Sequence, residues 1–351
     1  MVREPLSKAA VVNTIERKGG GPVPLVLHKW WGNGLREKYG AALDRVAANY
    51  PDDIFLSHPV APAMTVSGTA NPNYRWGHRS DYRGAESHSI GENVVLLPEW
   101  DELDWFLADF PNPREPGSFD KVRASLPAAG GRYKLGMWWH LFHERLWMIR
   151  GMENLMVDYF EEMERLKILG RRILEFNKAM VDQFAELGFD AFFSSDDLGH
   201  QAGLMMSPEV FQELYYPLYE ELAAHIHGQG MHFFLHSCGD NTALMDELIR
   251  AGVDVFHPVQ KGCMDERATA ARFGERISFL AGVDVQHLLP EGTVAEVRAG
   301  VRAGVRELID HMARPDGGLL LAAGNGIMPD TPLENIDAML DEMALYRAVR
   351  R

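Results

Sequence analysis

The chain has 351 residues, of which 46% are hydrophobic and 24% charged, so it can bury a large core as one or two globular domains. Its 50 acidic and 35 basic residues give a formal net charge of -15 at pH 7, which argues against nucleic acid and anionic membranes as partners. Only two cysteines, no apolar signal-peptide segment and no stretch near the ~20 apolar residues of a membrane span predict a cytoplasmic protein without a disulfide scaffold.

The first half of the chain predicts three strands and one long insertion. The strands are expected at 24–31, 53–58 and 134–140, where short apolar and aromatic runs occur. Residues 60–130, between the second and third strands, are rich in Gly, Pro, Asn and aromatic residues. This composition indicates a long insertion, and on a barrel such an insertion usually serves as a lid.

From about residue 180 onward, short strand-like runs alternate with amphipathic helical segments, which is the pattern of repeated βα units. The strands predicted in this half span 190–195, 231–236, 253–258, 277–282 and 318–323. Together with the first three they make eight, and eight parallel strands close into a barrel. We therefore predict an α/β fold, a single (β/α)8 TIM barrel over residues 1–351 with an insertion at about 60–130.

Helix start signals agree with this alternation. Ser207 followed by Pro208 predicts the N-cap and first residue of a helix that continues to about residue 230. The pairs Thr293 with Glu296 and Thr331 with Glu334 have the spacing of capping boxes. They predict two further helix starts near the C-terminus.

The motif HSCGD places His236 and Cys238 directly after a predicted strand. The C-terminal ends of barrel strands deliver their last residues into the active-site mouth. An imidazole and a thiolate two positions apart can both bind one Zn²⁺, which favours nitrogen and sulfur ligands in tetrahedral geometry. A hydrogen-bonded histidine beside a buried cysteine is the alternative interpretation.

A catalytic zinc site needs a third protein ligand and one open position. Neighbouring units offer three candidates from the residues alone, namely His257, Cys263 and Glu221. His257 is the best placed of these because it ends the next predicted strand.

Acidic side chains also follow a predicted strand, at Asp196 and Asp197. Two adjacent acids are costly to bury unless they are paired or hydrogen-bonded. We expect one of them to face the pocket as a general base or substrate anchor, with capping of a loop or helix as the alternative.

Further residues at strand ends could line a substrate pocket. Aromatic side chains there favour small aryl ligands, although alternation along a strand turns about half of such side chains into the helix layer. The candidate substrate-binding residues are His28, Trp30, His58, Trp139, His140, Asp284, Gln286 and Asn325.

Several segments together resemble the uroporphyrinogen decarboxylase superfamily, specifically its methyltransferase-like branch of corrinoid-linked methyltransferases. The segments are 97–113, 188–211, 233–260, 278–290 and 321–336. The resemblance implies zinc bound through a His-x-Cys pair, matched by His236 and Cys238, and a later cysteine after the last strand. Asn325 stands where that later cysteine is expected, which increases the weight of His257 as third ligand.

The resemblance implies a zinc-dependent methyltransferase that moves a methyl group between a small substrate and a corrinoid protein. A methoxylated aromatic substrate would make the reaction an O-demethylation, in which Asp197 orients or protonates the leaving group. The corrinoid would reside on a separate partner protein, because the chain has no DxHxxG-type cobalamin-binding segment. Whether the chain forms a homodimer stays open.

Other enzymes on this type of barrel differ from the methyltransferases in their site residues or in their need for a metal. The porphyrinogen decarboxylases carry an arginine-rich segment after the first strand, where this chain has LHKWWGNG, so porphyrinogen decarboxylation is not expected. A metal-independent decarboxylase or lyase on the same barrel, using Asp197 and nearby histidines for proton transfer, is the alternative function.

Overall fold

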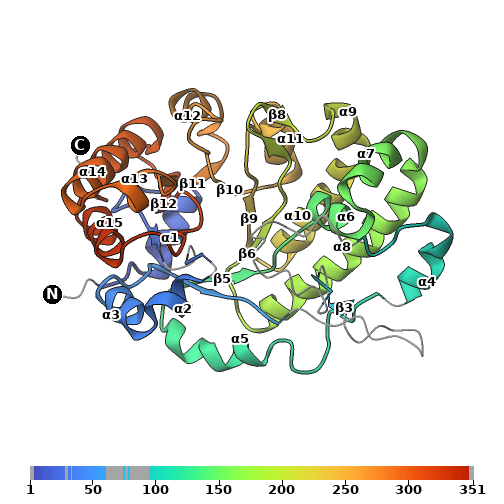
Figure 1. Cartoon of the computed structure of the whole chain (residues 1–351), viewed down its shortest axis with the longest axis horizontal. Coiled ribbons are helices and arrows are strands. Elements are labelled where there is room, and N and C mark those ends of the chain that lie inside the picture. The colour runs from blue at the N-terminus through green and yellow to red at the C-terminus, as the bar shows by residue number, and fades with distance from the viewer. Residues whose placement is uncertain are drawn as a thin grey trace.

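The computed structural model describes residues 4–27, 31–32, 34–60, 74–75, 78–79, 95–108 and 110–347. The candidate residues His28 and Trp30 and most of the segment 61–94 lie outside these ranges. Figure 1 shows the central strands with helices around them. Within the described ranges, no helix combines the length and apolar character that a membrane crossing needs.

Eight parallel strands form the predicted barrel, and each prediction for a strand is confirmed. In chain order they are β1 (Leu25–Val26), β2 (Ile54–Ser57), β5 (Tyr133–Met137), β6 (Ala191–Ser195), β9 (His232–His236), β10 (Val255–His257), β11 (Ser278–Val283) and β12 (Leu319–Ala323). They are hydrogen-bonded in the order β1-β12-β11-β10-β9-β6-β5-β2, so the barrel is nearly closed. Strands such as β6, β11 and β12 are buried along their whole length, as expected for parallel strands covered on both faces.

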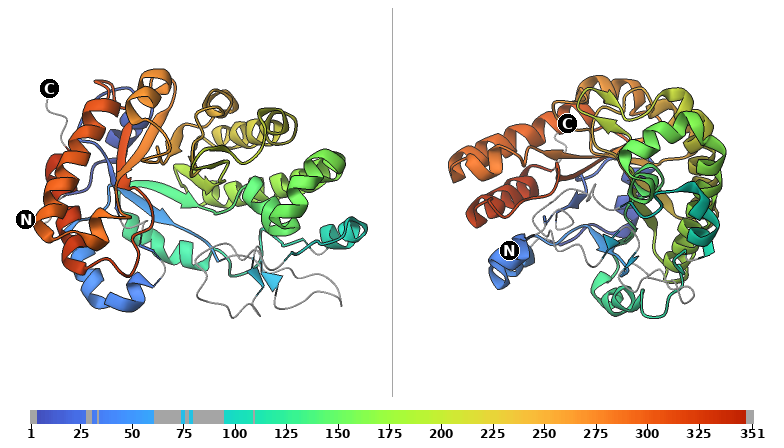
Figure 2. Two further views of the ribbon diagram at one scale, coloured as in Figure 1. Left: turned by 45° about the horizontal axis from the view of Figure 1, so that its top comes forward. Right: turned by 45° about the vertical axis from the view of Figure 1, so that its right-hand side comes forward.

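Helices of the βα units cover the outside of the strands, and Figure 2 shows α14 and α15 on one side of the barrel and α6 to α8 on the other. The helices are α1 (Lys8–Ile15), α2 (Leu35–Tyr39), α3 (Ala41–Asn49), α4 (Leu103–Ala108), α5 (Asp120–Ser125), α6 (His143–Arg150), α7 (Met152–Glu161), α8 (Met163–Glu186), α9 (Pro208–Val210), α10 (Tyr216–Gly228), α11 (Met245–Ala251), α12 (Glu266–Phe273), α13 (Leu288–Glu291), α14 (Val294–Met312) and α15 (Leu333–Tyr346). Short 3₁₀ turns occur at η2 (Trp100–Glu102) and η3 (Leu126–Ala129).

The helix predicted from Ser207 onward contains an irregular turn. Ser207 is the N-cap and its hydroxyl accepts a hydrogen bond from the Val210 amide, as predicted. A π-helical turn, η4 (Phe211–Tyr215), then separates α9 from α10. Pro217 at the start of α10 has no N–H to donate to a carbonyl four residues earlier, which gives a physical reason for the irregular turn.

The two predicted capping boxes have different outcomes. The first is confirmed, because the Thr293 side chain accepts from the Glu296 amide and the Glu296 carboxylate accepts from the Thr293 amide at the start of α14. For the second, the predicted helix start is confirmed, since α15 begins at Leu333, but the capping box is wrong because Pro332 is the N-cap and there is no side-chain cap. Thr331 lies one residue before this N-cap, and its buried hydroxyl makes no hydrogen bond with the described residues.

The predicted insertion connects β2 to β5, and its described part contains η2, α4, α5 and η3. The residue pairs β3 (Tyr74–Arg75) and β4 (His78–Arg79) form a short antiparallel ladder within it. A role as a lid depends on the segment 61–94, most of which lies outside the described residues.

The N-terminal end of the barrel is covered by α1. The side chain of Asp53 links β1 and β2, the first and last strands of the hydrogen-bonded order, at a junction that we call the β1–β2 seam. The carboxylate of Asp53, which is fully buried, accepts the Leu25 amide at 2.8 Å and the Leu6 amide at 2.7 Å. It also pairs with Arg347 at 2.5 Å, and its own amide donates to the Leu25 carbonyl at 3.1 Å. Asp53 therefore joins β1, β2 and the C-terminal helix at one point.

Candidate functional site

Asp197, His236 and Cys238 converge at the C-terminal ends of two neighbouring strands. Ser195 of β6 is in register with His236 of β9, so Asp197 and Cys238 each lie two residues beyond a paired position. One potential ligand atom from each of the three side chains lies within 4.8 Å of the others. We call these three residues the Asp-His-Cys cluster.

Two distances within the cluster suit the ligands of one tetrahedral zinc ion. The Sγ atom of Cys238 lies 3.3 Å from Nε2 of His236, and that nitrogen lies 3.6 Å from Oδ1 of Asp197. Two ligand atoms of one tetrahedral zinc are roughly 3.4–3.6 Å apart, from zinc bond lengths of about 2.0–2.3 Å. Nitrogen, sulfur and carboxylate oxygen are also the donors that zinc takes in proteins.

His257 lies behind His236 rather than within the cluster. The two Nδ1 atoms are 2.7 Å apart, and the rings stack with centroids 4.9 Å apart. One of these two nitrogens donates to the other, and Nε2 of His236 lies toward Cys238 and Asp197; a metal on Nε2 would require His236 Nδ1 to be the donor. The position matches that of a residue supporting a metal ligand, which is not the ligand role predicted for His257 from the sequence.

The loop that carries Cys238 is held by backbone hydrogen bonds. The Cys238 amide donates to Oδ1 of Asp197 at 2.8 Å, and the Gly239 amide donates to Oε1 of Gln260 at 2.7 Å. Gly239 has a φ of 81°, and a Cβ there would lie 2.4 Å from the Gly199 backbone. The glycine of HSCGD is thus required for the close approach of this loop to the chain following β6.

Burial raises the pKa of the Cys238 thiol well above its usual range, and the negative charges of Asp197 and Glu144 act in the same direction. Without a cation the sulfur therefore carries its proton at neutral pH. A divalent cation in the cluster would reverse this preference, so metal binding would release a proton.

Asp196 supports the site from within the core. It is fully buried, and its carboxylate accepts the Phe142 amide at 3.2 Å and the Glu144 amide at 2.8 Å at the start of α6. The hydroxyl of Tyr219 donates to the same carboxylate at 2.7 Å. Of the two adjacent acids, Asp196 therefore caps a helix, and Asp197 faces the cluster.

A second buried carboxyl, Glu144, lies beside this cap. Its Oε2 accepts the Ser195 hydroxyl at 2.5 Å, and its Oε1 lies 3.2 Å from Nδ1 of His140. Burial and the charge of Asp197 raise the pKa of Glu144 to about 8, and burial and the charge of Glu144 raise that of Asp196 to about 7. The two acids cannot both be charged at low cost in this environment.

These raised pKa values predict how stability depends on pH. An acid whose pKa is about 4 when unfolded and higher when folded stabilises the fold at low pH, and that contribution is lost as pH rises through the folded value. The free energy of unfolding of the metal-free protein should therefore include a term that falls between about pH 5 and 8. In urea unfolding across this range, the free energy of unfolding should depend less on pH in Glu144→Gln than in wild type. It should depend on pH as in wild type in Glu213→Gln, a substitution of an exposed residue. The same pH dependence in wild type and both variants would contradict a raised pKa for Glu144.

An aromatic wall adjoins the cluster. The Trp139 ring contacts the His236 ring with centroids 5.3 Å apart and packs edge-on against Phe193 at the same distance. His140 follows directly, with 17% of its side chain exposed. These predicted pocket residues therefore lie beside the cluster, at the C-terminal end of β5.

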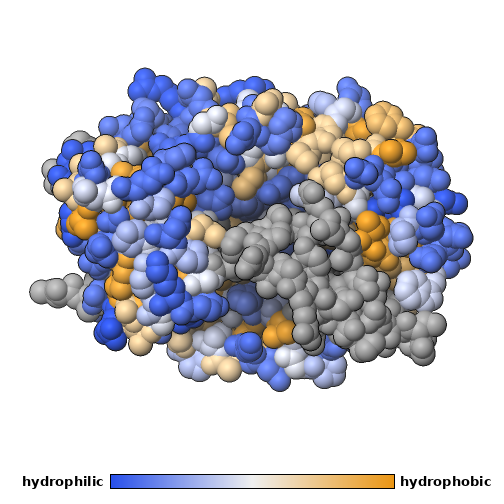
Figure 3. Space-filling view, in the orientation of Figure 1, coloured by the Kyte–Doolittle hydropathy of each residue, from blue (hydrophilic) through white to orange (hydrophobic). Residues whose placement is uncertain are grey.

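Three predicted polar residues share one cavity. Asp284, Gln286 and Asn325 line a space of about 40 Å³ beyond the ends of β10, β11 and β12, together with Gln260. Since Gln260 also holds the Cys238 loop, this cavity adjoins the cluster. Figure 3 shows that the surface is hollowed near the centre of the view, with hydrophilic side chains in the hollow.

Other sequence candidates lie elsewhere. His58 follows β2 on the surface, and Cys263 lies in the turn after β10, outside the groups of potential metal ligands found among the described residues. Glu221 forms ion pairs with Arg171 and Lys178 of α8 on the outside of the barrel, so it does not contribute to the cluster.

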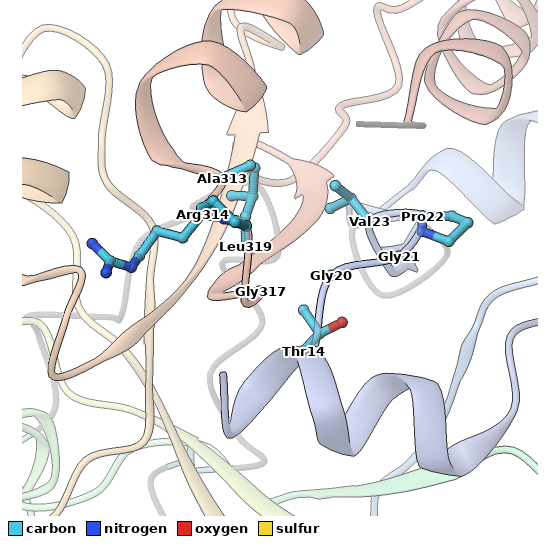
Figure 4. A pocket seen from close by; sticks show the side chains of 10 residues that line it. Thr14, Gly20, Gly21, Pro22, Val23, Ala313, Arg314, Gly317 and Leu319 are labelled. Atoms are coloured by element: carbon cyan, nitrogen blue, oxygen red, sulfur yellow. The ribbon is translucent and has the colours of Figure 1, made fainter. Parts of the chain in front are cut away.

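A cavity of about 530 Å³ lies at the opposite end of the barrel (Figure 4). It is formed by the end of α1, the segment before β1 and the segment before β12, with Thr14, Val23 and Leu319 among its walls. Barrel enzymes use the C-terminal ends of their strands for chemistry, and this cavity lies at the N-terminal ends. Size alone therefore does not identify the functional site here.

Sequence reasoning missed Glu144, Ser195 and Tyr219. Glu144 and Arg145 are both buried despite their charge, on a helix whose other residues are largely apolar. Adjacent charges within the run WWHLFHERLW were the available signal, because buried charges are usually functional or paired. Tyr219 gave no signal, since it is one of several aromatic residues on its helix.

The chain is similar to known proteins in sequence and in structure. Residues 146–346, more than half of the chain, match the family model for uroporphyrinogen decarboxylase (URO-D). Two curated relatives, both methylcobamide:CoM methyltransferase MtaA, come from Methanosarcina barkeri and from its strain Fusaro. They are 25% identical over 191 and 195 residues, which is 54% of this chain and 50% of each relative.

The chain thus matches about half the length of these curated relatives. In structure, it resembles a methyltransferase from Methanosarcina mazei with a TM-score of 0.67 and 15% identity, over 98% of this chain and 100% of the other. At this identity the likeness establishes the shared barrel. From the family match and the fold together, the chain belongs to the uroporphyrinogen decarboxylase family and resembles its methyltransferase members.

Proposed function

We propose that this protein is a zinc-dependent methyltransferase that moves a methyl group between a small substrate and a corrinoid protein. The observation that carries the proposal is the Asp-His-Cys cluster, whose interatomic distances suit one tetrahedral zinc at the C-terminal ends of β6 and β9. The similarity to methylcobamide:CoM methyltransferases supports the reaction type.

In this proposal His236, Cys238 and Asp197 hold the metal. When bound, zinc would supply Lewis acidity that stabilises negative charge developing on an oxygen or sulfur of the substrate. His257 orients the His236 ring, and the Cys238 and Gly239 amides keep the loop in place. Asp197 would be the third protein ligand of the metal. Its alternative role is to orient the leaving group without contacting the metal.

The substrate would lie against Trp139, with the polar groups of Asp284, Gln286 and Asn325 on the neighbouring side. An aromatic wall of this kind suits a methoxylated aromatic ring. In an O-demethylation the CH3–O bond breaks, both electrons of the new CH3–Co bond come from cobalt(I) of the corrinoid, and the aryloxide takes up a proton. The corrinoid belongs to a separate protein in this proposal.

Methyl transfer to free cob(I)alamin tests the proposal. Zinc-loaded protein should convert cob(I)alamin to methylcobalamin, followed by its absorption spectrum, with at least one member of a panel of methoxylated aromatics. Chelator-treated protein is the control and should be inactive until zinc is restored. Failure of zinc-loaded protein across the panel would contradict the methyltransferase, and full activity of metal-free protein on a carboxylated substrate would favour the decarboxylase or lyase.

A further inference from the structure

The backbone at His140 adopts a conformation that few residues other than glycine accept. Its φ is 66°, and Arg17 is the other non-glycine residue with positive φ among those the structure describes. The His140 amide donates to Oγ of Ser195 at 3.1 Å, and the Leu141 amide donates to the Ser195 carbonyl at 2.8 Å. Such strain persists where the surroundings dictate it, and it gathers at functional sites.

The ring of His140 has a contact of its own, with the side chain of Glu144. Nδ1 lies 3.2 Å from Oε1 of Glu144, whose side chain is only 4% exposed. The other carboxyl oxygen of Glu144 accepts the Ser195 hydroxyl at 2.5 Å. Ser195 therefore supports both the backbone of His140 and the carboxyl group that contacts its ring.

We propose that Glu144 and Ser195 fix His140 as the tautomer with hydrogen on Nδ1, so that Nε2 presents a lone pair to a proton donor on the substrate. Nδ1–H then donates to Oε1 of Glu144, which is either a carboxylate oxygen or the carbonyl oxygen of an acid whose proton lies on Oε2. This inference rests on the proposed function. It adds a substrate class, namely methyl donors that also carry an O–H or N–H group.

The surroundings of His140 agree with this role. Burial, followed by the charge of Arg145, lowers the pKa of His140 to about 3 against the opposite effect of Asp197, so the ring is neutral at pH 7. Trp139, the preceding residue, contacts the His236 ring, so the chain passes beside the cluster at this point, and 17% of the His140 side chain is exposed. Glu144 acts as a positioning residue, since its carboxyl group contacts the His140 ring.

Nitrogen-15 NMR of histidine-labelled protein reads the tautomer directly and needs no activity. The His140 signals are assigned by their loss in His140→Asn, a substitution that tolerates positive φ. Wild type at pH 7 should show a neutral ring protonated at Nδ1. A ring protonated at Nε2, or on both nitrogens, would overturn the inference.

Variants of the supporting residues separate positioning from simple packing. Glu144→Gln keeps an oxygen acceptor and should preserve the Nδ1–H tautomer, whereas Glu144→Met should give a mixture of tautomers. If Glu144→Met does not fold, Ser195→Ala removes a single hydroxyl and should also shift the populations. If Glu144→Met and Ser195→Ala, or whichever of the two folds, kept the wild-type tautomer of His140, the inference would be overturned.

A matched pair of methyl donors tests the substrate class. The kcat/KM of wild type for 2-methoxyphenol should be roughly tenfold higher than that for 1,2-dimethoxybenzene, because only the first has an O–H group to donate to His140. Tenfold corresponds to one hydrogen bond of about 1.4 kcal/mol. His140→Asn should remove this preference and retain its zinc. An Nδ1–H tautomer in a protein that transfers no methyl group would count against the proposed function only. Active methyl transfer with an Nε2–H tautomer, or with equal use of both donors by wild type, would overturn this inference only.

Discussion

Replacing Cys238 by serine should reduce methyl transfer by at least about 100-fold. Loss of a residue that merely supports a metal ligand typically costs 10–100-fold in metal affinity or activity, and loss of a ligand should cost more. His236→Ala should have a similar effect, because its Nε2 lies within ligand distance of both other members of the cluster. The measurement is the initial rate of methylcobalamin formation at saturating substrate.

The matched control for this prediction is Cys263→Ser, the same substitution at the other cysteine. Cys263 is partly buried and lies outside the cluster, so its replacement by the similarly sized serine should leave the rate within about twofold. Equal rates for Cys238→Ser and wild type would contradict a metal-ligand role for Cys238. If Cys263→Ser reduced the rate and Cys238→Ser did not, the functional thiol would be that of Cys263.

Replacing Asp53 by alanine should destabilise the fold by about 3–5 kcal/mol, the usual effect of removing one partner of a buried ion pair. The substitution would leave Arg347 and the Leu25 and Leu6 amides without this carboxylate at the β1–β2 seam. Urea unfolding followed by circular dichroism measures the change. Asp53→Asn, which keeps the shape and one acceptor, should fall between alanine and wild type.

Asp44→Ala provides the comparison at the surface. Asp44 pairs with Arg36 at 2.7 Å, but both side chains are more than half exposed. Exposed pairs of this kind contribute about 0–1 kcal/mol. If Asp53→Ala and Asp44→Ala had equal small effects, the seam would not depend on the Asp53 carboxylate.

The barrel itself was predictable from the sequence because its parallel strands are buried on both faces. Runs such as those of β6 and β12 are short, apolar and separated by helical segments, which is a pattern visible without coordinates. His236 and Cys238 were identifiable because His236 ends such a run and Cys238 lies two residues beyond it, and strand ends in a barrel meet at one face.

The remaining features depend on contacts between distant parts of the chain. Asp53 meets Arg347 across 294 positions, and Glu144 meets Ser195 across 51, so no local pattern marks either pair. Sequence position also did not show that the Asp197 carboxylate lies close to His236 and Cys238 while His257 contacts Nδ1 of His236, since it does not reveal which side-chain atoms face one another. Side-chain direction at a strand end is set by packing.

Metal content, measured by inductively coupled plasma mass spectrometry on tag-free protein, tests the central claim most directly. Wild type should contain about one zinc per chain, as expected for one cluster of this kind. His236→Ala, Cys238→Ser and Asp197→Ala should lose the zinc while remaining folded, whereas His257→Gln should still bind zinc, with about 10–100-fold weaker affinity. Wild-type protein without zinc after reconstitution, or full zinc content in both His236→Ala and Cys238→Ser, would contradict the account.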